Sequence, residues 1–111
     1  MDSEGSEKQE YYIKKFDGTN FIIWKERMMD VLTNKGLLDP LFERQENSGH
    51  TDAQWTLMDK KAKATIRLHL AESIFFTIMD HKTTKELWDS LCATWESKSA
   101  SNKVFLMKKL F

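Results

Sequence analysis

Few side chains in this sequence have the type and spacing needed for catalysis or metal binding. The three histidines, His50, His69 and His81, have no cysteine partners at zinc-ligand spacing, and Cys92 is the single cysteine. Cys92 falls within an apolar helical pattern, where a cysteine usually acts as a small buried hydrophobe rather than as a nucleophile. The sequence also contains no glycine-rich phosphate loop, serine elbow or His-Glu metal motif. We therefore predict no catalytic residue, no metal site and no cofactor.

One group of basic side chains has the spacing needed to contact phosphates. Lys60, Lys63 and Arg67, reinforced by Lys61, are three or four residues apart and share one face of a predicted helix. However, the chain has no net charge, with 17 Lys+Arg and 17 Asp+Glu, and no aromatic residues interleave with these lysines. Both features favour an ordinary solvated helix face over a nucleic-acid site. Weak RNA contact through this face is kept as the alternative.

The four tryptophans could form either a cage around a ligand or part of a packed core. Each lies on an apolar stripe with helical spacing, and this pattern favours core packing. The residues that we predict to form the core are Trp24, Met28, Trp55, Ile66, Leu87, Trp88, Leu91 and Trp95.

The first element allows two interpretations. The stretch "KFDGTNFIIWKERMMDVL", residues 15–32, has an Asp-Gly dipeptide at 17–18 that is typical of a two-residue hairpin. Its later apolar residues have helical spacing and do not alternate as in a strand. We therefore predict a turn followed by a helix that Thr19 or Asn20 caps and Gly36 ends. The short segment before the turn is expected to lie extended against the core.

The remaining pattern predicts an all-α fold, a compact bundle of about four to five helices. Asp52 is expected to cap the second helix, and Thr83 and Glu86 have capping-box spacing at the start of a later one. Residues 71–79 are either a bent continuation of the second helix or a separate short helix, because periodicity does not distinguish the two. The region 37–51, which holds the single proline, is expected to be an anchored loop. The predicted helices cover residues 20–35, 52–70, 72–79, 84–97 and 101–111.

The ends of the chain differ in composition from the rest. Residues 1–10 contain no apolar residue after Met1, so we expect a disordered acidic tail ahead of one domain at 11–111. The apolar stripe of the last helix continues to Phe111 without a stop signal, which indicates a fragment of a longer chain. No apolar run approaches the roughly 20 residues that span a bilayer, and no signal peptide is recognised. A cytosolic or nuclear protein is expected.

Three stretches resemble the Gag polyprotein of Copia-type LTR retrotransposons, most closely those of plants. Residues 15–32 are similar to a Lys-Phe-Asp/Asn-Gly-x-Asn opening followed by a helix that carries tryptophan. "AKATIRLHLAESI", residues 62–74, is similar to an Ala-x-x-x-Ile-x-x-x-Leu helix. "TTKELWDSLCATWESKSASNKVFLMKKL", residues 83–110, resembles a Thr-Ala/Thr-x-x-x-Trp-x-x-Leu helix, then an aromatic residue, Ser/Thr-Asn-Lys and a leucine-rich helix. The resemblance covers about Lys15 to Phe111.

This resemblance implies a structural role. Gag supplies the shell of a virus-like particle that packages the element's RNA, and this region would be the N-terminal, all-helical part of the capsid. The implied partner is the chain itself, as a homo-oligomer in full-length Gag and a monomer or weak dimer in isolation. RNA binding is expected to be weak at most without the downstream Cys-Cys-His-Cys zinc knuckle. The implied location is cytoplasmic particles, with the nucleus as an alternative, and no membrane partner is expected.

Two uses of spare apolar surface follow from this family assignment. Self-association would use residues such as Ile22, Met29, Leu57, Phe75 and Phe76. The alternative function is a domesticated Gag-like module that grips a peptide or helix in a groove between its own helices. The two phenylalanines and the segment 37–42 would line that groove.

Overall fold

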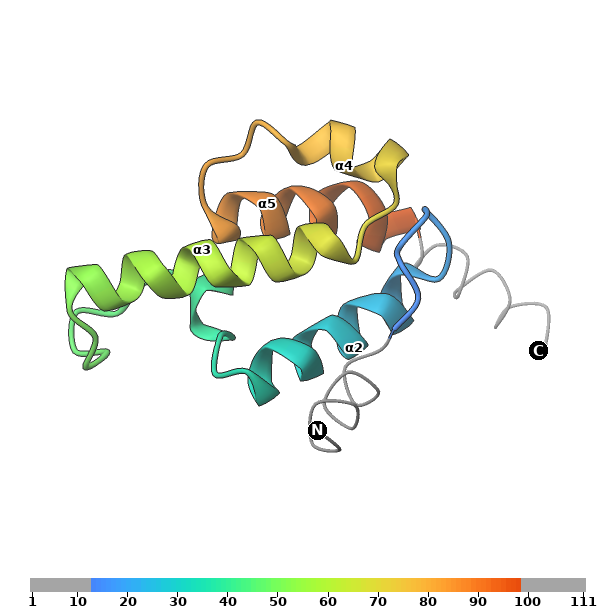
Figure 1. Ribbon diagram of the computed structural model, residues 1–111. Coiled ribbons are helices and arrows are strands. Elements are labelled where there is room, and N and C mark those ends of the chain that lie inside the picture. Colours follow the sequence, from blue (N-terminus) through green and yellow to red (C-terminus); the bar gives the residue numbers. More distant parts are fainter. Residues whose placement is uncertain (1–12, 99–111) are drawn as a thin grey trace, which may run out of the picture.

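The computed structural model describes residues 13–98, which form a bundle of helices (Figure 1). Within this range no β-strand is present, and the predicted all-α fold is confirmed. The predicted tail at 1–10 and the predicted helix at 101–111 lie outside the described residues. The α-helices are α2 (Phe21–Asn34), α3 (Asp52–Leu68), α4 (Glu72–Ile78) and α5 (Thr84–Leu91), with a 3₁₀ turn η1 (Asp39–Leu41) and a π-helical turn η2 (Cys92–Glu96).

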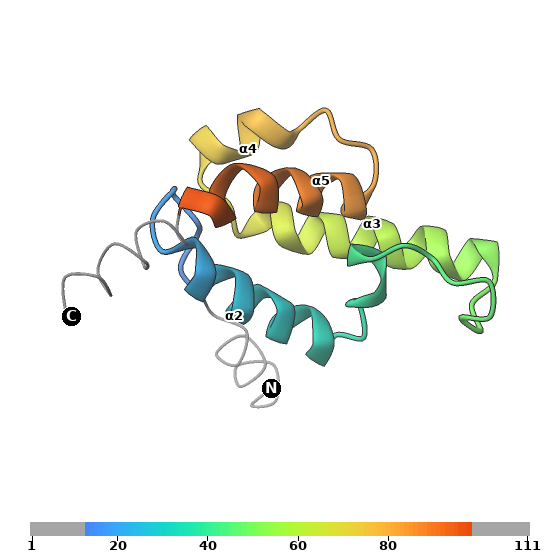
Figure 2. The same cartoon turned by 180° about the vertical axis from the view of Figure 1, so that it is seen from behind.

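The helices are stacked with α3 and α5 between the two outer helices. Figures 1 and 2 show α4 at one end of this stack and α2 at the other. Thr84, which is fully buried at the start of α5, ties the two central helices together. Its hydroxyl donates to the backbone carbonyl of Asp59 (2.7 Å), and its amide donates to the Asp59 carboxylate (3.0 Å). Because α2 and α4 lie at the two ends of the stack, each of them has one side that does not face another helix of the bundle.

Six of the eight predicted core residues are buried: Trp24, Met28, Ile66, Leu87, Trp88 and Leu91. Trp95 is half-buried and packs against this core. All four α-helices contribute to the buried cluster, and the loop 37–41 adds Leu37, Pro40 and Leu41. The core is therefore shared by the four α-helices and the short turn η1, whereas η2 only packs against it.

Trp55 is the exception, and its prediction as a core residue is wrong. Its indole is only half-buried and lies outside the core cluster. The first turns of α3, which carry Trp55, extend past α2 and α5, so Trp55 lies outside the core (Figure 1). Loop residues cover it instead, with the Arg44 guanidinium 5.6 Å and the His50 ring 6.2 Å from its ring.

The segment before α2 is held by an aromatic cluster and a short backbone pairing. The Phe16 ring lies 5.2 Å from Phe21, 5.3 Å from Trp24 and 5.3 Å from Trp95. Its amide donates to the His69 carbonyl (2.8 Å), and its carbonyl accepts from the Ala71 amide (2.9 Å), which makes a parallel bridge to Leu70. The predicted extended segment is thus present at Phe16.

Helix α2 follows the Asp-Gly turn, as predicted, but its start is capped differently. Asn20 occupies the N-cap position with φ 55° and makes no side-chain capping bond. The Asp17 carboxylate instead accepts from the Thr19 amide (3.1 Å) and hydroxyl (2.6 Å), and these bonds close the turn itself. At the other end Gly36 adopts φ 71° and the Leu37 amide donates to the Leu32 carbonyl, so the predicted glycine stop is confirmed.

Helix α3 begins with a complete capping box, one residue earlier than predicted. Thr51, not Asp52, is the N-cap. Its hydroxyl accepts from the Gln54 amide (3.1 Å), and its own amide donates to the Gln54 side-chain carbonyl (2.8 Å). Asp52 is instead the first helical residue, where its negative charge interacts favourably with the helix N-terminus.

Replacement of Thr51 by alanine should therefore lower the free energy of unfolding by about 1 kcal/mol, because the capping oxygen is lost. Chemical denaturation measures this difference. Thr56→Ala is the matched control, since Thr56 is exposed within the same helix, and it should change the free energy of unfolding by only a few tenths of a kcal/mol. Equal losses in the two variants would contradict the capping role.

The structure separates α4 from α3, which decides between the two alternatives for residues 71–79. Helix α3 stops at Leu68 because the following backbone turns to pair with Phe16.

The start of α5 is capped by Thr83, whose hydroxyl accepts from the Glu86 amide (3.1 Å). The Glu86 carboxylate accepts from the Lys82 amide rather than from that of Thr83, so only half of the predicted capping box forms.

Candidate assembly surfaces

The most prominent surface features of the described residues are exposed apolar side chains rather than clusters of polar groups. Among residues 13–98, no group of three or more His, Cys, Asp or Glu side chains could hold a metal ion. None of the helices in that range has the length and apolar character needed to cross a bilayer. The exposed large hydrophobic residues are Ile23, Phe42, Leu57, Leu68, Phe76 and Met79.

The outer side of α4 forms an apolar surface with an acidic border, which we call the α4 face: Glu72, Phe75, Phe76, Met79 and Asp80. Ile74 and Ile78 are buried in the core, so the opposite side of α4 faces solvent. Phe76 is 72% exposed and Met79 is 50% exposed. Glu72, Phe75, Phe76 and Met79 line a shallow hollow of about 320 Å³. This surface can accept an apolar side chain from another molecule.

The outer side of α3 forms a second apolar surface with a basic border, which we call the α3 face: Leu57, Lys60, Lys61, Ala64 and Leu68. Ala62 and Ile66 are fully buried on the inner side of this helix. Leu57 is 53% exposed and Leu68 is 71% exposed. Because these two leucines are separated by three helical turns, the face extends along most of α3.

The predicted phosphate-contacting residues Lys60, Lys63 and Arg67 do not form one free stripe. The Lys63 ammonium donates to the Lys82 carbonyl (2.7 Å), and the Arg67 guanidinium lies 4.7 Å from the Phe75 ring centre. Lys60 is exposed on the α3 face. The structure therefore uses two of the three side chains to attach the α4 region to α3.

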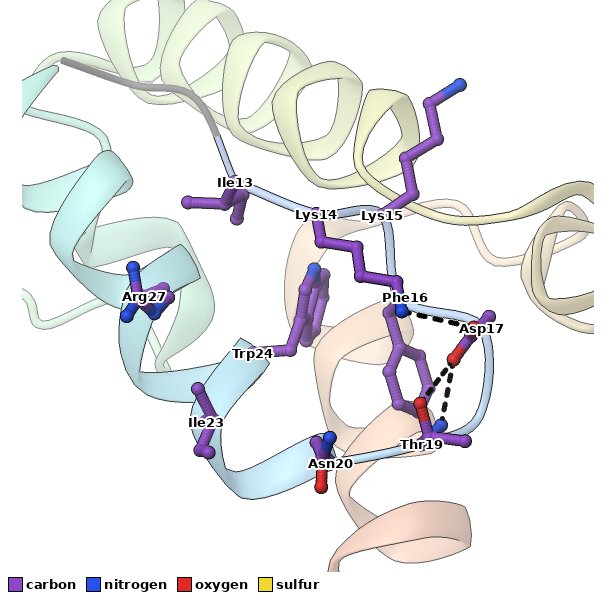
Figure 3. A pocket seen from close by; sticks show the side chains of 10 residues that line it. All are labelled: Ile13, Lys14, Lys15, Phe16, Asp17, Thr19, Asn20, Ile23, Trp24 and Arg27. Carbon is purple, nitrogen blue, oxygen red and sulfur yellow. Dashed lines mark hydrogen bonds and ion pairs between the residues drawn. The ribbon is translucent and has the colours of Figure 1, made fainter. Parts of the chain in front are cut away.

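A cleft of about 280 Å³ lies where the segment 13–19 meets α2 (Figure 3). Its basic lining includes Lys14, whose ammonium lies 3.8 Å from the Asp17 carboxylate. The hydroxyl and amide of Thr19 lower the pKa of the Asp17 carboxyl, so this negative charge persists. The Trp24 indole donates to the His69 carbonyl (3.2 Å) and is thus held in place. The cleft is best described as the junction that attaches this segment to α2.

The π-helical turn η2 is attached to α2 by one ion pair. The Lys25 ammonium donates to the Glu96 carboxylate at 2.7 Å. Burial raises the pKa of the neighbouring Cys92 thiol, which disfavours the nucleophilic thiolate. The prediction of Cys92 as a small packing residue agrees with its half-buried position against the core.

The Lys25–Glu96 pair predicts a pH-dependent stability. The hydrogen bond to Glu96 raises the pKa of Lys25 above its ordinary value of 10.5, so the stabilisation is full below that pH and is lost as pH rises through the raised value. Glu96→Gln should lower the free energy of unfolding at pH 7 by about 0.5 kcal/mol, a figure typical of a partly exposed pair. Denaturation at pH 7 and pH 11 measures it, with Glu46→Gln in the exposed loop as control. A deficit that grows at alkaline pH would contradict this assignment.

The apolar residues proposed for self-association are only partly on the surface. Leu57 and Phe76 are exposed, whereas Ile22, Met29 and Phe75 are half-buried. Sequence reasoning missed Leu68 and Met79. Leu68 could have been found, because it lies far around the helix from the buried pair Ala62 and Ile66.

The predicted groove between helices is also not a single site. Phe75 and Phe76 line the hollow on the α4 face, whereas Phe42 lines a different hollow together with Trp55. The two sets of residues therefore do not converge on one groove.

Comparison with known proteins assigns the chain to a family. A family model described as the gag-polypeptide of LTR copia-type matches residues 28–111. The chain belongs to this Gag family. It is also 34% identical over 103 residues to the "Retrovirus-related Pol polyprotein from transposon TNT 1-94" of Nicotiana tabacum. That match covers 91% of this Gag chain but 8% of the polyprotein. No solved structure matches this Gag chain.

The family match confirms the resemblance to plant Copia-type elements. Gag polypeptides of this family are structural rather than catalytic, which supports a general capsid or Gag role for the chain.

Proposed function

We propose that this chain is the N-terminal capsid domain of a Copia-type Gag and that it associates with copies of itself to build the shell of a virus-like particle. Membership of the Gag family supports this proposal. The single structural observation that carries it is the division of Leu57, Leu68, Phe76 and Met79 between two outward helix faces. Side chains of this size gain about 1.5–3 kcal/mol each when they are fully buried, so a second copy would stabilise both faces.

Weak individual contacts are sufficient for such a function. A closed shell repeats the same contacts by symmetry, and each contact is strengthened by the others that hold the same molecule in place. The isolated domain is therefore a monomer or weak dimer, and large assemblies form when neighbouring domains of Gag add further contacts. Particles would form in the cytoplasm, and RNA would bind only weakly to this domain alone.

Light scattering after size-exclusion chromatography tests the proposal. The chain alone should elute as a small species whose mass rises slowly with concentration. The longer Gag polypeptide that contains this chain should give large assemblies at the same concentration. Small species from both proteins at every concentration would contradict shell building. A monomer that binds a peptide tightly, while the longer Gag never assembles, would favour the alternative of a recruited binding module.

A further inference from the structure

The residues that make up the two apolar faces carry charges of opposite sign, although the Arg67 guanidinium of α3 also lies 4.7 Å from the Phe75 ring of the α4 face. Residues 72–80, which form α4 and its end, contain Glu72 and Asp80 and no lysine or arginine. The α3 face instead carries Lys60 and Lys61. Within residues 13–98 no ion pair joins any of these four charged groups to another side chain. Each face therefore combines exposed apolar side chains with charges that have no opposite partner in the described part of the molecule.

The two faces point in different directions. Lys63 and Arg67 are directed toward the α4 side, because they contact the Lys82 carbonyl and the Phe75 ring. Ala64 and Leu68 each follow one of these residues, and successive residues of an α-helix are rotated by about 100°. Ala64 and Leu68 thus lie on a different side of α3 from the residues that contact the α4 region, and α4 lies at the outer end of the stack (Figures 1 and 2). One molecule cannot bring its own two faces together.

Neither face is suited to pairing with itself. Two α3 faces would place lysines against lysines, and two α4 faces would place carboxylates against carboxylates, and such like-charge contacts disfavour association. The α4 face of one copy against the α3 face of another brings carboxylates next to ammonium groups and apolar side chains next to apolar side chains. In addition, Ala64 is small enough to let a bulky side chain such as Phe76 approach the α3 backbone closely.

We propose that the α4 face of one copy binds the α3 face of the next. This inference rests on the proposed function, because it assumes that the partner is a second Gag molecule. The contact joins two different surfaces, so each bound pair keeps one free α3 face and one free α4 face. Contacts of this kind produce rings or extended arrays rather than isolated dimers. A particle shell requires this property.

Reversal of charge on each face tests the proposed contact. Lys60→Glu with Lys61→Glu changes the α3 face, and Glu72→Lys with Asp80→Lys changes the α4 face. Each pair of changes should reduce the particle yield of the longer Gag at least about tenfold, because the opposing charges then repel. The protein with all four changes should recover to within about twofold of the unmodified yield, since the charges are again complementary. Lys15→Glu with Arg27→Glu is the control of equal charge change outside both faces and should assemble normally.

Mixing provides a second readout on the 111-residue chain itself. Sedimentation at high concentration should show a heavier species for a mixture of the two face variants than for either variant alone. Particles that form equally well in every variant would overturn this contact but leave shell building intact. Stronger assembly after neutralisation of the α3 lysines alone, Lys60→Gln with Lys61→Gln, would overturn it in favour of two α3 faces in contact, because the repulsion between lysines is then removed. Absence of particles from unmodified Gag would overturn the proposed function, and this contact with it.

Discussion

Replacement of Phe16 by alanine is expected to lower the free energy of unfolding by about 3–5 kcal/mol, the range for a large aromatic side chain removed from a core. Phe16 is 2% exposed, and its ring contacts Phe21, Trp24 and Trp95. Loss of the ring leaves a cavity between α2 and η2. It also removes contacts that hold the segment before α2, whose backbone pairs with residues 69–71, against the core. For a domain of this size, that loss is a large fraction of the total stability.

Chemical denaturation followed by tryptophan fluorescence measures the change. Phe76→Ala removes the same side chain from a position that is 72% exposed, so it should change the free energy of unfolding by less than about 0.5 kcal/mol. A small effect at Phe16, comparable to that at Phe76, would mean that the aromatic cluster does not hold the segment before α2 in place.

Replacement of Phe76 by aspartate should reduce particle assembly of the longer Gag by at least about tenfold, while the domain remains folded. The phenyl ring occupies the centre of the α4 face, and a carboxylate in its place would be desolvated in any apolar contact. Because the side chain is exposed in the monomer, the same change costs the fold little. Particle yield after sedimentation measures assembly, and circular dichroism measures folding.

Phe42→Asp is the matched control for this variant. Phe42 is 50% exposed but belongs to neither the α3 face nor the α4 face. Its replacement should leave the particle yield within about twofold of the unmodified protein, since an exposed position outside a contact tolerates polar residues. Equal loss of particles in both variants would show that exposed aromatic residues promote assembly without regard to the α4 face.

The helices were predictable because their signals are local. Apolar residues at three-and-four spacing predicted α2, α3 and α5, and Gly36 marked the end of α2 through a backbone angle that glycine adopts at low cost. The ends of elements were less predictable when two neighbouring residues could do the same work. Thr51 and Asp52 are both good cap residues, but only Thr51 has a glutamine three residues later, and this capping-box spacing could have distinguished them in the sequence.

Features that depend on distant residues were not predictable in the same way. Trp55 lies on a correct apolar stripe, but α3 is longer than the elements packed against it, so the indole meets a loop instead of the core. The break between α3 and α4 arises from the pairing of Phe16 with residues 69–71, which are far away in the sequence. The residues of the α3 and α4 faces could be identified fully only from the burial of each side chain in the structure. Leu57 and Phe76 were nevertheless predicted correctly as exposed apolar residues.

Electron microscopy of the longer Gag polypeptide that contains this chain, purified and concentrated, tests most directly whether the domain works by meeting copies of itself. We expect closed particles of regular diameter from the unmodified protein and only small species from the Phe76→Asp variant. Unmodified Gag that remains folded and dispersed at every concentration would contradict the account.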